Sequence, residues 1–145
     1  MLRSEKEKWL LLLTKLDIRT GVDLQSVAIM EKKILSNQLR MDSIFTLREL
    51  AYAEGKRRKA EYLSARFAAK EAFLKAIGTG MGKGIELNEI GIRNEALSGK
   101  PNLELLGNAL QFVNKLGVVS MDVSLSHSDE YAIAQVVLLL DQERK

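Results

Sequence analysis

Two carboxylates, Asp23 and Glu71, are the residues of this sequence best suited to hold a metal ion. Carboxylate oxygens are hard ligands of the kind that Mg²⁺ accepts, and magnesium sites use one or two of them, with waters and substrate phosphates completing the octahedron. The plainer interpretation is a solvated Asp23 and an ion pair between Glu71 and Lys75 at i and i+4 of a helix, worth only about 0.2 to 0.5 kcal/mol. Spacing alone favours this plainer interpretation.

A glycine-rich stretch, GTGMGKG at residues 78–84, could bind an anion. Its alternating glycines leave backbone N–H groups free to approach a phosphate, and Lys83 lies close by. The pattern is neither a Walker A loop nor a dinucleotide fingerprint. It also follows a helix C-terminus, where the macrodipole repels phosphate, so Lys75 or Lys83 would have to compensate. A flexible connection between helix and strand is the favoured alternative.

His127 is the single histidine of the chain. It continues the parity of Val123 and Leu125 at the end of a strand, which favours a hydrogen-bonded histidine in the core. Its place beside a turn would also suit a side chain that protrudes into a site, where imidazole can accept a proton or bind phosphate near neutral pH. Both interpretations stay open.

A basic cluster, KRRK at residues 56–59, could contact the phosphates of a nucleic acid. No recognition helix or aromatic stacking platform is recognisable around it, so a solvated basic surface is favoured, and an acidic protein would also fit. The net charge of +3 and the pI near 9.2 favour an anionic partner without choosing among nucleic acid, acidic protein and phosphorylated small molecule.

Composition narrows the class of protein. The 145 residues, 46% apolar and 28% charged, predict one self-supporting globular domain. The absence of cysteine excludes thiolate catalysis and zinc sites built on sulfur. The apolar run at residues 9–13 is too short for a signal peptide or a membrane span, so we expect a soluble cytoplasmic protein with no membrane contact.

The candidate residues depend on secondary structure to position them. Residues 18–24 alternate between apolar and other side chains, which predicts a strand with Asp23 on the face opposite Val22. Asp23 therefore need not be buried with Val22. An amphipathic helix is expected over about residues 25–39.

Two further helices follow. Thr46 and Glu49 fit a capping box that opens a short helix, which Gly55 ends, and residues 60–77 contain neither glycine nor proline. At about 100° per residue, one face of this long helix holds Leu63, Phe67, Leu74 and Ile77, and another holds Ala65, Ala69, Ala72 and Ala76. The long helix is expected to pack on two sides, with Glu71 at the edge of a buried element.

The second half of the chain is rich in strand patterns. A strand is predicted within residues 85–92, a turn at 98–101, a short helix over 108–116 and a hairpin with a heavily buried second strand over 121–140. Because strands and helices do not alternate as βαβ units, we predict an α+β fold. It is one small domain, in which a mainly antiparallel sheet packs against the long central helix.

Three stretches of the sequence together resemble the holo-acyl-carrier-protein synthase family of 4'-phosphopantetheinyl transferases, over about residues 18–140. RFAAKEAFLKAIGTG at 66–80 matches the family's helix and glycine loop almost residue for residue, with GVDL before it. GKPNLEL and SLSHSDEYAIAQVV fall where the family has its later strands. The family domain is expected over residues 16–141, with residues 1–15 as an N-terminal extension beyond the usual family start.

The resemblance implies transfer of 4'-phosphopantetheine from coenzyme A to a serine hydroxyl of an apo acyl carrier protein, with release of adenosine 3',5'-bisphosphate. It implies Mg²⁺ as the cofactor, held by Asp23 of GVDL and Glu71 of AAKEA. Displacement at a pyrophosphate agrees with this, because a cation is needed to neutralise the leaving group.

The same resemblance implies further roles. Glu71, Lys75 and His127 are the expected catalytic residues, with Glu71 or His127 as the base. The residues expected to bind coenzyme A are Arg66, Lys75, Gly78, Thr79, Gly80 and His127. A homotrimer with sites at the subunit interfaces is implied, so Arg66 and His127 of one copy would serve Asp23 and Glu71 of another.

Acyl carrier proteins are typically acidic. The basic cluster at 56–59, together with Lys32, Lys33 and Arg40, is therefore expected to steer and dock one electrostatically. The expected partners are thus a carrier protein, coenzyme A and further copies of this chain.

The chain departs from the family pattern after the strand aspartate, where Ser26 replaces an acidic residue and Ile29 replaces an arginine associated with carrier docking. This departure motivates an alternative, a non-catalytic module that binds coenzyme A or a nucleotide, although a binding-only relative would have no reason to retain Asp23 and Glu71. A small nucleic-acid binder is supported only by the pI and the basic cluster, and no nucleic-acid partner is expected.

Overall fold

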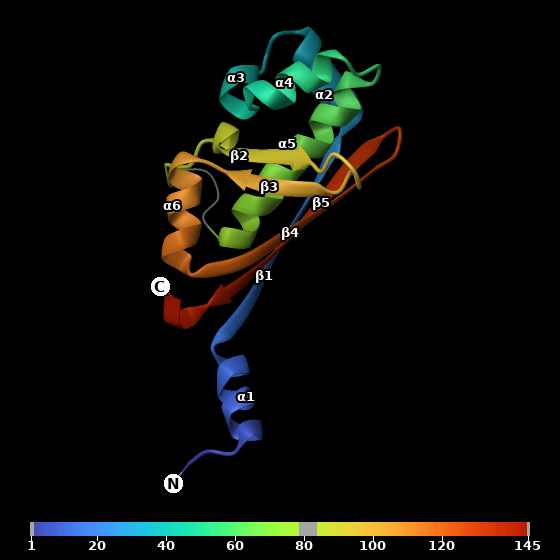
Figure 1. The fold of residues 1–145 in the computed structure, drawn as a ribbon. Helices are drawn as coiled ribbons and strands as arrows, with labels where there is room; N and C mark the ends of the chain where they lie inside the picture. The colour runs from blue at the N-terminus through green and yellow to red at the C-terminus, as the bar shows by residue number, and fades with distance from the viewer. Residues whose placement is uncertain (1, 79–83, 145) are drawn as a thin grey trace.

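The computed structural model describes residues 2–78 and 84–144, and these form an α+β fold (Figure 1). The strands are β1 (Leu16–Ser26), β2 (Ile90–Asn94), β3 (Pro101–Leu105), β4 (Val118–His127) and β5 (Tyr131–Asp141). The helices are α1 (Glu5–Thr14), α2 (Val27–Leu35), α3 (Met41–Ile44), α4 (Leu47–Glu54), α5 (Lys59–Ile77) and α6 (Gly107–Leu116). Two 3₁₀ turns, η1 (Leu87–Glu89) and η2 (Gln142–Arg144), also lie in the described chain.

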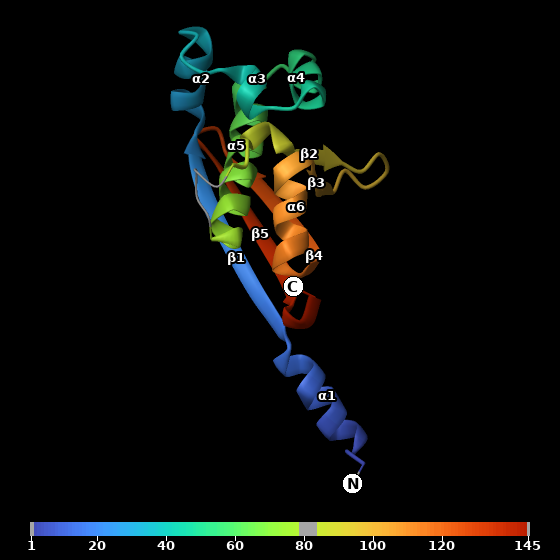
Figure 2. The same cartoon turned by 90° about the vertical axis from the view of Figure 1, so that its left-hand side faces the viewer.

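Two antiparallel sheets form the framework. In the larger sheet β5 lies between β1 and β4, while β2 and β3 form a separate two-stranded sheet. The long helix α5 packs along one face of the larger sheet, in contact with β1 and β5 (Figures 1 and 2). The predicted fold class, a mainly antiparallel sheet against a long central helix in one small domain, is confirmed.

Helix α5 packs on two sides, as its residue pattern predicts. On one side it meets β1 so closely that a Cβ on Gly21 would lie 1.9 Å from the carbonyl oxygen of Ala72 and 2.8 Å from the backbone nitrogen of Ala76. Only glycine fits this approach. On another side Leu63 packs with Phe45, which follows α3, in a second apolar cluster. The sheet contact sets how closely side chains of β1 approach those of α5.

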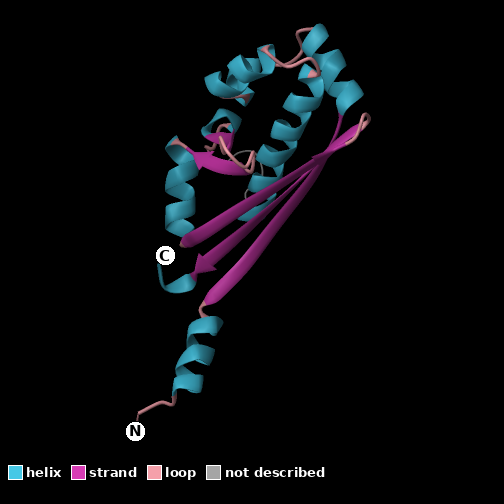
Figure 3. Cartoon of the chain, turned by 45° about the vertical axis from the view of Figure 1, so that its right-hand side comes forward, coloured by secondary structure: helices cyan, strands magenta, loops and turns pink. Residues whose placement is uncertain are grey.

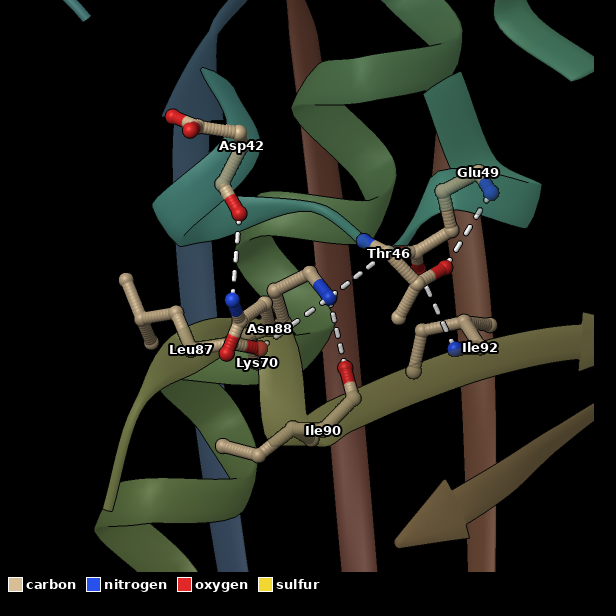
Figure 4. A network of polar contacts seen from close by, with 8 residues as sticks. All are labelled: Asp42, Thr46, Glu49, Lys70, Leu87, Asn88, Ile90 and Ile92. Carbon is tan, nitrogen blue, oxygen red and sulfur yellow. Dashed lines mark hydrogen bonds and ion pairs between the residues drawn. The ribbon is translucent and has the colours of Figure 1, made fainter. Parts of the chain in front are cut away.

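A buried ion pair ties α4, α5 and β2 together (Figure 4). The side chain of Lys70 is fully buried, and its Nζ lies 2.7 Å from Glu49 Oε1 and donates to the carbonyl oxygens of Leu87 (3.2 Å) and Ile90 (2.6 Å). Burial lowers the pKa of Lys70, and Glu49 opposes this effect. Glu49 Oε2 accepts from the backbone N–H of Ile92 at 3.1 Å. Both charges are thus compensated inside the protein, which is the condition under which a buried ion pair is tolerated.

The burial of β1 is the reverse of what its apolar side chains suggest. The alternation is confirmed, since Asp23 and Val22 lie on opposite faces, but Asp23 and Gly21 face α5 while Ile18 (67%), Val22 (53%) and Leu24 (58%) are exposed. The close approach at Gly21 explains this, because the absence of a side chain at this position lets α5 lie directly on the face that carries Asp23. One face of β1 is left apolar and uncovered within the chain.

Other expectations are corrected in detail. The helix expected over 25–39 ends at Leu35, and Asn37 then takes a left-handed backbone conformation with φ 57°. The strand expected within 85–92 is instead η1 followed by β2, because Leu87 and Ile90 are three residues apart, a spacing that suits a helical turn. The capping box of Thr46 and Glu49 is confirmed.

Helix α1 projects beyond the end of β1, away from the body of the protein (Figure 3). Its residues lie at the N-terminal end of the described chain, where none of the ten helical positions is buried. In the part of the chain that the structure describes, no helix combines the length and the apolar composition needed to cross a membrane.

Candidate functional site

Asp23 and Glu71 lie close together, with Lys75 beside them, where β1 crosses the C-terminal half of α5. Lys75 Nζ lies 3.0 Å from Asp23 Oδ1 and donates to the carbonyl oxygen of Val22 at 3.0 Å. The Asp23 side chain is only 12% exposed, so the interpretation of a solvated strand aspartate is wrong. Lys75 on α5 thus forms an ion pair with Asp23 on β1. The i, i+4 spacing within a helix cannot reveal a pair between two different elements. We call Asp23 and Glu71 the acidic pair.

The electrostatics of the acidic pair favour a bound cation. Burial raises the pKa of Glu71, the nearby charge of Asp23 raises it further, and Lys75 acts in the opposite direction. Gln25 Nε2 donates to Asp23 Oδ2 at 2.6 Å and so holds that carboxylate in place. A carboxylate whose charged form is disfavoured by burial and by a neighbouring carboxylate is stabilised in that form when a cation binds beside it.

The two carboxylates of the acidic pair are a set of ligands that suits Mg²⁺. Among residues 2–78 and 84–144, no group of three or more His, Cys, Asp or Glu side chains is arranged to hold a metal ion. Magnesium retains several waters and often takes only one or two protein carboxylates, with substrate phosphates as further ligands. The chemistry of Asp23 and Glu71 therefore fits the magnesium expected from the sequence.

A second group of candidate residues lines a cleft of about 840 Å³ between the first half of α5, α4 and the β2–β3 hairpin. We call it the basic cleft. Its cationic lining residues are Arg48, Lys56, Arg57, Arg58, Arg66 and Arg93, with His127 at its edge. The KRRK cluster thus contributes three of its four residues to a concave site, and not to a merely solvated surface.

Arg66 is the best-positioned cation of the basic cleft. Its side chain is buried, its Nη2 donates to Asn94 Oδ1 at 2.5 Å, and its guanidinium lies 3.9 Å from the centre of the Tyr62 ring. The hydrogen bond and the stacking fix the plane of the guanidinium. A fixed, planar, always charged group is well suited to recognise a phosphate.

His127 lines the same cleft and is not a core residue. Its side chain is 53% exposed, and its Nδ1 contacts Glu61 Oε1. Glu61 in turn holds Arg58, whose Nε lies 2.9 Å from Glu61 Oε2. Of the two interpretations that the sequence left open, the core histidine is therefore wrong, and the imidazole at the rim of a site agrees with the structure.

The predicted site residues fall into two separate groups within one chain. Asp23, Glu71 and Lys75 form one group, and they are not among the described residues that line the basic cleft, to which Arg66 and His127 belong. Gly78 ends α5 in a left-handed conformation with φ 78°, just beyond Lys75. Thr79 and Gly80 lie outside the described residues.

Several residues of these two groups were not singled out from the sequence. Tyr62 stands four residues before Arg66 on α5, a spacing that places two side chains on one helix face and could have revealed the stacking. Glu61 and Asn94 come from positions that no periodic pattern connects to Arg66 or His127. Their contribution depends on tertiary packing.

Proteins of known activity share the sequence pattern of this chain. A sequence model described as the 4'-phosphopantetheinyl transferase superfamily matches residues 19–136. The holo-[acyl-carrier-protein] synthase of Geobacter sulfurreducens is 39% identical over 120 residues, which cover 82% of this chain and 94% of that protein. The corresponding synthase of Trichlorobacter lovleyi is 46% identical over 102 residues, covering 70% of this chain and 80% of that protein.

Solved structures agree with the sequence relatives. The holo-(acyl-carrier-protein) synthase of Bacillus anthracis, in complex with CoA (3',5'-ADP), matches with a TM-score of 0.69 at 36% identity, over 84% of this chain and 96% of that one. The synthase of Neisseria meningitidis matches with a TM-score of 0.74 at 33% identity, over 83% and 96% of the two chains. The chain therefore belongs to the 4'-phosphopantetheinyl transferase superfamily, among its holo-acyl-carrier-protein synthases.

Proposed function

We propose that this protein transfers 4'-phosphopantetheine from coenzyme A to a serine hydroxyl of an apo acyl carrier protein in the cytoplasm. Adenosine 3',5'-bisphosphate is the second product, and Mg²⁺ is required. The observation that carries the proposal is the acidic pair, in which burial and Asp23 raise the pKa of Glu71 beside the cationic Lys75. Membership of the family and a relative solved with coenzyme A support it.

The acidic pair is proposed to act on the pyrophosphate of coenzyme A. Asp23 and Glu71 would hold Mg²⁺, which neutralises the charge that develops on the leaving phosphate. Lys75 is proposed to bind the same phosphate oxygens, since its Nζ already lies beside Asp23 at 3.0 Å. Glu71 is also the proposed base for the carrier serine, whose proton it would accept through an intervening water, and His127 is the alternative base.

The basic cleft is proposed to bind the adenosine end of coenzyme A. Arg66, held by Asn94 and Tyr62, would recognise the 3'-phosphate, with His127 near it. The other cations of the cleft would add attraction for a ligand with several negative charges. Gly78, Thr79 and Gly80, at the end of α5, are proposed to line the pocket for the rest of the molecule.

A homotrimer would join the two groups. One chain keeps the acidic pair apart from the basic cleft, so we propose that the acidic pair of one copy faces the cleft of a neighbour. The uncovered sheet face supplies an interface, since Ile18, Val22 and Leu24 of β1 lie beside Ile133 and Val137 of β5 on it. Contiguous exposed apolar side chains of this kind mark contact surfaces between proteins.

The carrier is proposed to dock on α2 and the adjoining basic residues. Ile29, in the place of a family arginine, is 55% exposed and offers an apolar contact, while Lys32 and Lys33 lie in the last turn of α2. Ser26 has a structural role, because its Oγ accepts from the backbone N–H of Ile29 at 3.2 Å and caps the helix. The replacement of an acidic residue by Ser26 therefore preserves a helix N-cap.

The test is the intact mass of an apo acyl carrier protein after incubation with this protein, coenzyme A and Mg²⁺. The expected result is a gain of one 4'-phosphopantetheine that is lost when the metal is chelated. No gain with several carriers, while coenzyme A still binds, would instead support the alternative of a non-catalytic coenzyme A-binding module.

A further inference from the structure

Helix α1 presents apolar side chains that its own chain does not cover. Trp9, Leu10, Leu12 and Leu13 are each more than half exposed, and none of the 10 residues of the helix is buried. At about 100° per residue these four side chains span an arc of roughly 160°. A helix with so wide an apolar face is expected to be buried against something.

The part of the chain that the structure describes does not supply that partner. The base of α1 is held in place, because the backbone N–H of Gln142 donates to the carbonyl oxygen of Lys15 at 2.9 Å and Lys15 Nζ lies 2.8 Å from Glu143 Oε1. From this anchor the helix points away from α5 and the larger sheet in all three views (Figures 1, 2 and 3). Isolated helices shorter than about 12 to 15 residues are marginal in water, so a helix of this length needs outside packing.

The uncovered sheet face indicates which partner this is. The exposed apolar side chains of α1 continue along the chain into Ile18, Val22 and Leu24, with only residues 14–17 between the two apolar stretches. A copy that covers the sheet face therefore lies next to α1 as well. In a closed ring with cyclic symmetry, every copy directs the same end of its sheet to the same side. All the α1 helices would then leave the assembly together.

We propose that the α1 helices of neighbouring copies pack against one another through the Trp9 and Leu13 side of the helix. This helical contact extends the interface formed by the sheet faces, and the inference rests on the homotrimer of the proposed function. The polar residues of α1 fit self-association, because Glu5 and Glu7 accompany Lys6 and Lys8 and keep the helix from strong self-repulsion. A helix that lies on an anionic membrane instead has a polar face rich in Lys and Arg.

Trp9 is a built-in reporter, since it is the single tryptophan of the chain. The experiment measures acrylamide quenching of its fluorescence together with the mass of the assembly by light scattering, with the urea-unfolded chain as reference. The expected result is a trimer in which quenching is at least about threefold weaker than in urea, and a Leu10→Glu/Leu13→Glu variant that stays trimeric but regains the quenching. A trimer whose Trp9 is quenched as in urea overturns the α1 contact, whereas a monomer overturns the trimer itself.

Vesicles of phosphatidylglycerol and phosphatidylcholine separate a protein contact from a membrane contact. Trp9 is expected to be shielded without vesicles and unchanged when they are added. Shielding that appears only with vesicles would assign α1 to a membrane surface and overturn the proposal.

Engineered thiols give a second readout, because the chain has no cysteine. Leu13→Cys lies in the apolar arc, and Glu7→Cys lies on the opposite side of the same helix. Mild oxidation is expected to cross-link Leu13→Cys chains at least about tenfold more than Glu7→Cys chains, since a disulfide needs Cα atoms within about 7 Å. Equal cross-linking of the two variants would contradict a specific helix contact.

Discussion

The acidic pair and the basic cleft use charge in different ways, although α5 contributes to both. The acidic pair concentrates two carboxylates at one point, where burial and the charge of Asp23 raise the pKa of Glu71. The basic cleft spreads six Lys and Arg side chains and His127 over about 840 Å³. The function of the acidic pair therefore depends on each of its two carboxylates. In the basic cleft, the remaining cations can still attract an anionic ligand when one of them is removed. The two regions should therefore respond very differently to single substitutions.

The largest effect is expected at the acidic pair. Glu71→Gln, which keeps the size of the side chain, should lower kcat by at least about 100-fold, the scale for removing one preorganised charge-stabilising group. Steady-state transfer to an apo carrier measures it, with circular dichroism and coenzyme A binding as controls for the fold. A variant with near wild-type kcat would contradict the assignment of Glu71.

A substitution at Gly21 tests whether the distance between β1 and α5 matters. Gly21→Ala adds a Cβ that would lie 1.9 Å from the Ala72 carbonyl oxygen, so β1 must move and carry Asp23 away from Lys75. We expect a loss of kcat of about 10-fold or more, together with destabilisation of about 1 to 3 kcal/mol from overpacking.

The basic cleft provides the matched comparison for Gly21→Ala, because Ala72 and Ala76, which the new Cβ would meet, do not line it. The preference in kcat/KM for coenzyme A over 3'-dephospho-coenzyme A, which reports on the basic cleft alone, should stay close to that of wild type in this variant. Loss of this preference with unchanged kcat would show that the two regions are not separable in this way.

Substitution of Arg66 is expected to have a smaller effect on activity, and the effect should depend on whether the ligand carries a 3'-phosphate. Wild type should prefer coenzyme A over 3'-dephospho-coenzyme A by about 10-fold or more in kcat/KM, because a charge-assisted hydrogen bond contributes about 1.5 to 3 kcal/mol. Arg66→Ala should lose most of this preference, while Arg57→Ala, an exposed cation of the same cleft, should retain it. An Arg66→Ala enzyme that still discriminates fully would exclude Arg66 as the 3'-phosphate contact.

The smallest expected effect is that of Glu71→Gln on thermal stability in the absence of Mg²⁺. Folded Glu71 has a raised pKa, so it binds its proton more tightly than the unfolded chain does. Its stabilising contribution is complete below the ordinary pKa of 4.5 and is lost as the pH rises through the raised value. At pH 7 without Mg²⁺, Glu71→Gln should therefore raise Tm, at a scale of about 2 to 4 °C for each 1 kcal/mol.

Thermal scans with and without Mg²⁺ check this expectation. Mg²⁺ should stabilise wild type by binding the folded state and should have less effect on Glu71→Gln. If Glu71→Gln lowered Tm at pH 7 and raised it only in acid, folding would lower the pKa of Glu71 and the expected linkage would have the wrong sign.

The sequence allowed much of the framework to be predicted, because local patterns decide it. The long helix and its two packed faces, the capping box at Thr46 and the C-terminal hairpin all follow from rules that act within a few residues. The burial of β1 could not be predicted in the same way. Its apolar face is exposed, and the contact that buries the opposite face, Gly21 against α5, joins residues about 50 positions apart in the sequence.

The candidate site could be predicted only in part, because its contacts join residues that lie far apart in the sequence. Spacing could not show that Lys75 pairs with Asp23, or that Glu61 holds His127, because these pairs form only when separate elements pack. The resemblance to a family pointed to Asp23 and Glu71, whereas their placement in one partly buried group comes from the fold. The division of the site into two groups was expected only through the implied trimer.

Mixing two impaired enzymes tests most directly whether the site is shared between copies. Glu71→Gln supplies an intact basic cleft, and Arg66→Glu, which places a carboxylate where the 3'-phosphate is proposed to bind, supplies an intact acidic pair. The two variants are mixed in equal amounts and allowed to exchange subunits. Random assembly into a cyclic homo-oligomer should then place an intact acidic pair against an intact basic cleft at about a quarter of the interfaces. We expect transfer activity to recover to about that fraction of wild type. Activity that stays at the level of the separate variants, with subunit exchange verified by mass, would contradict a site shared between copies.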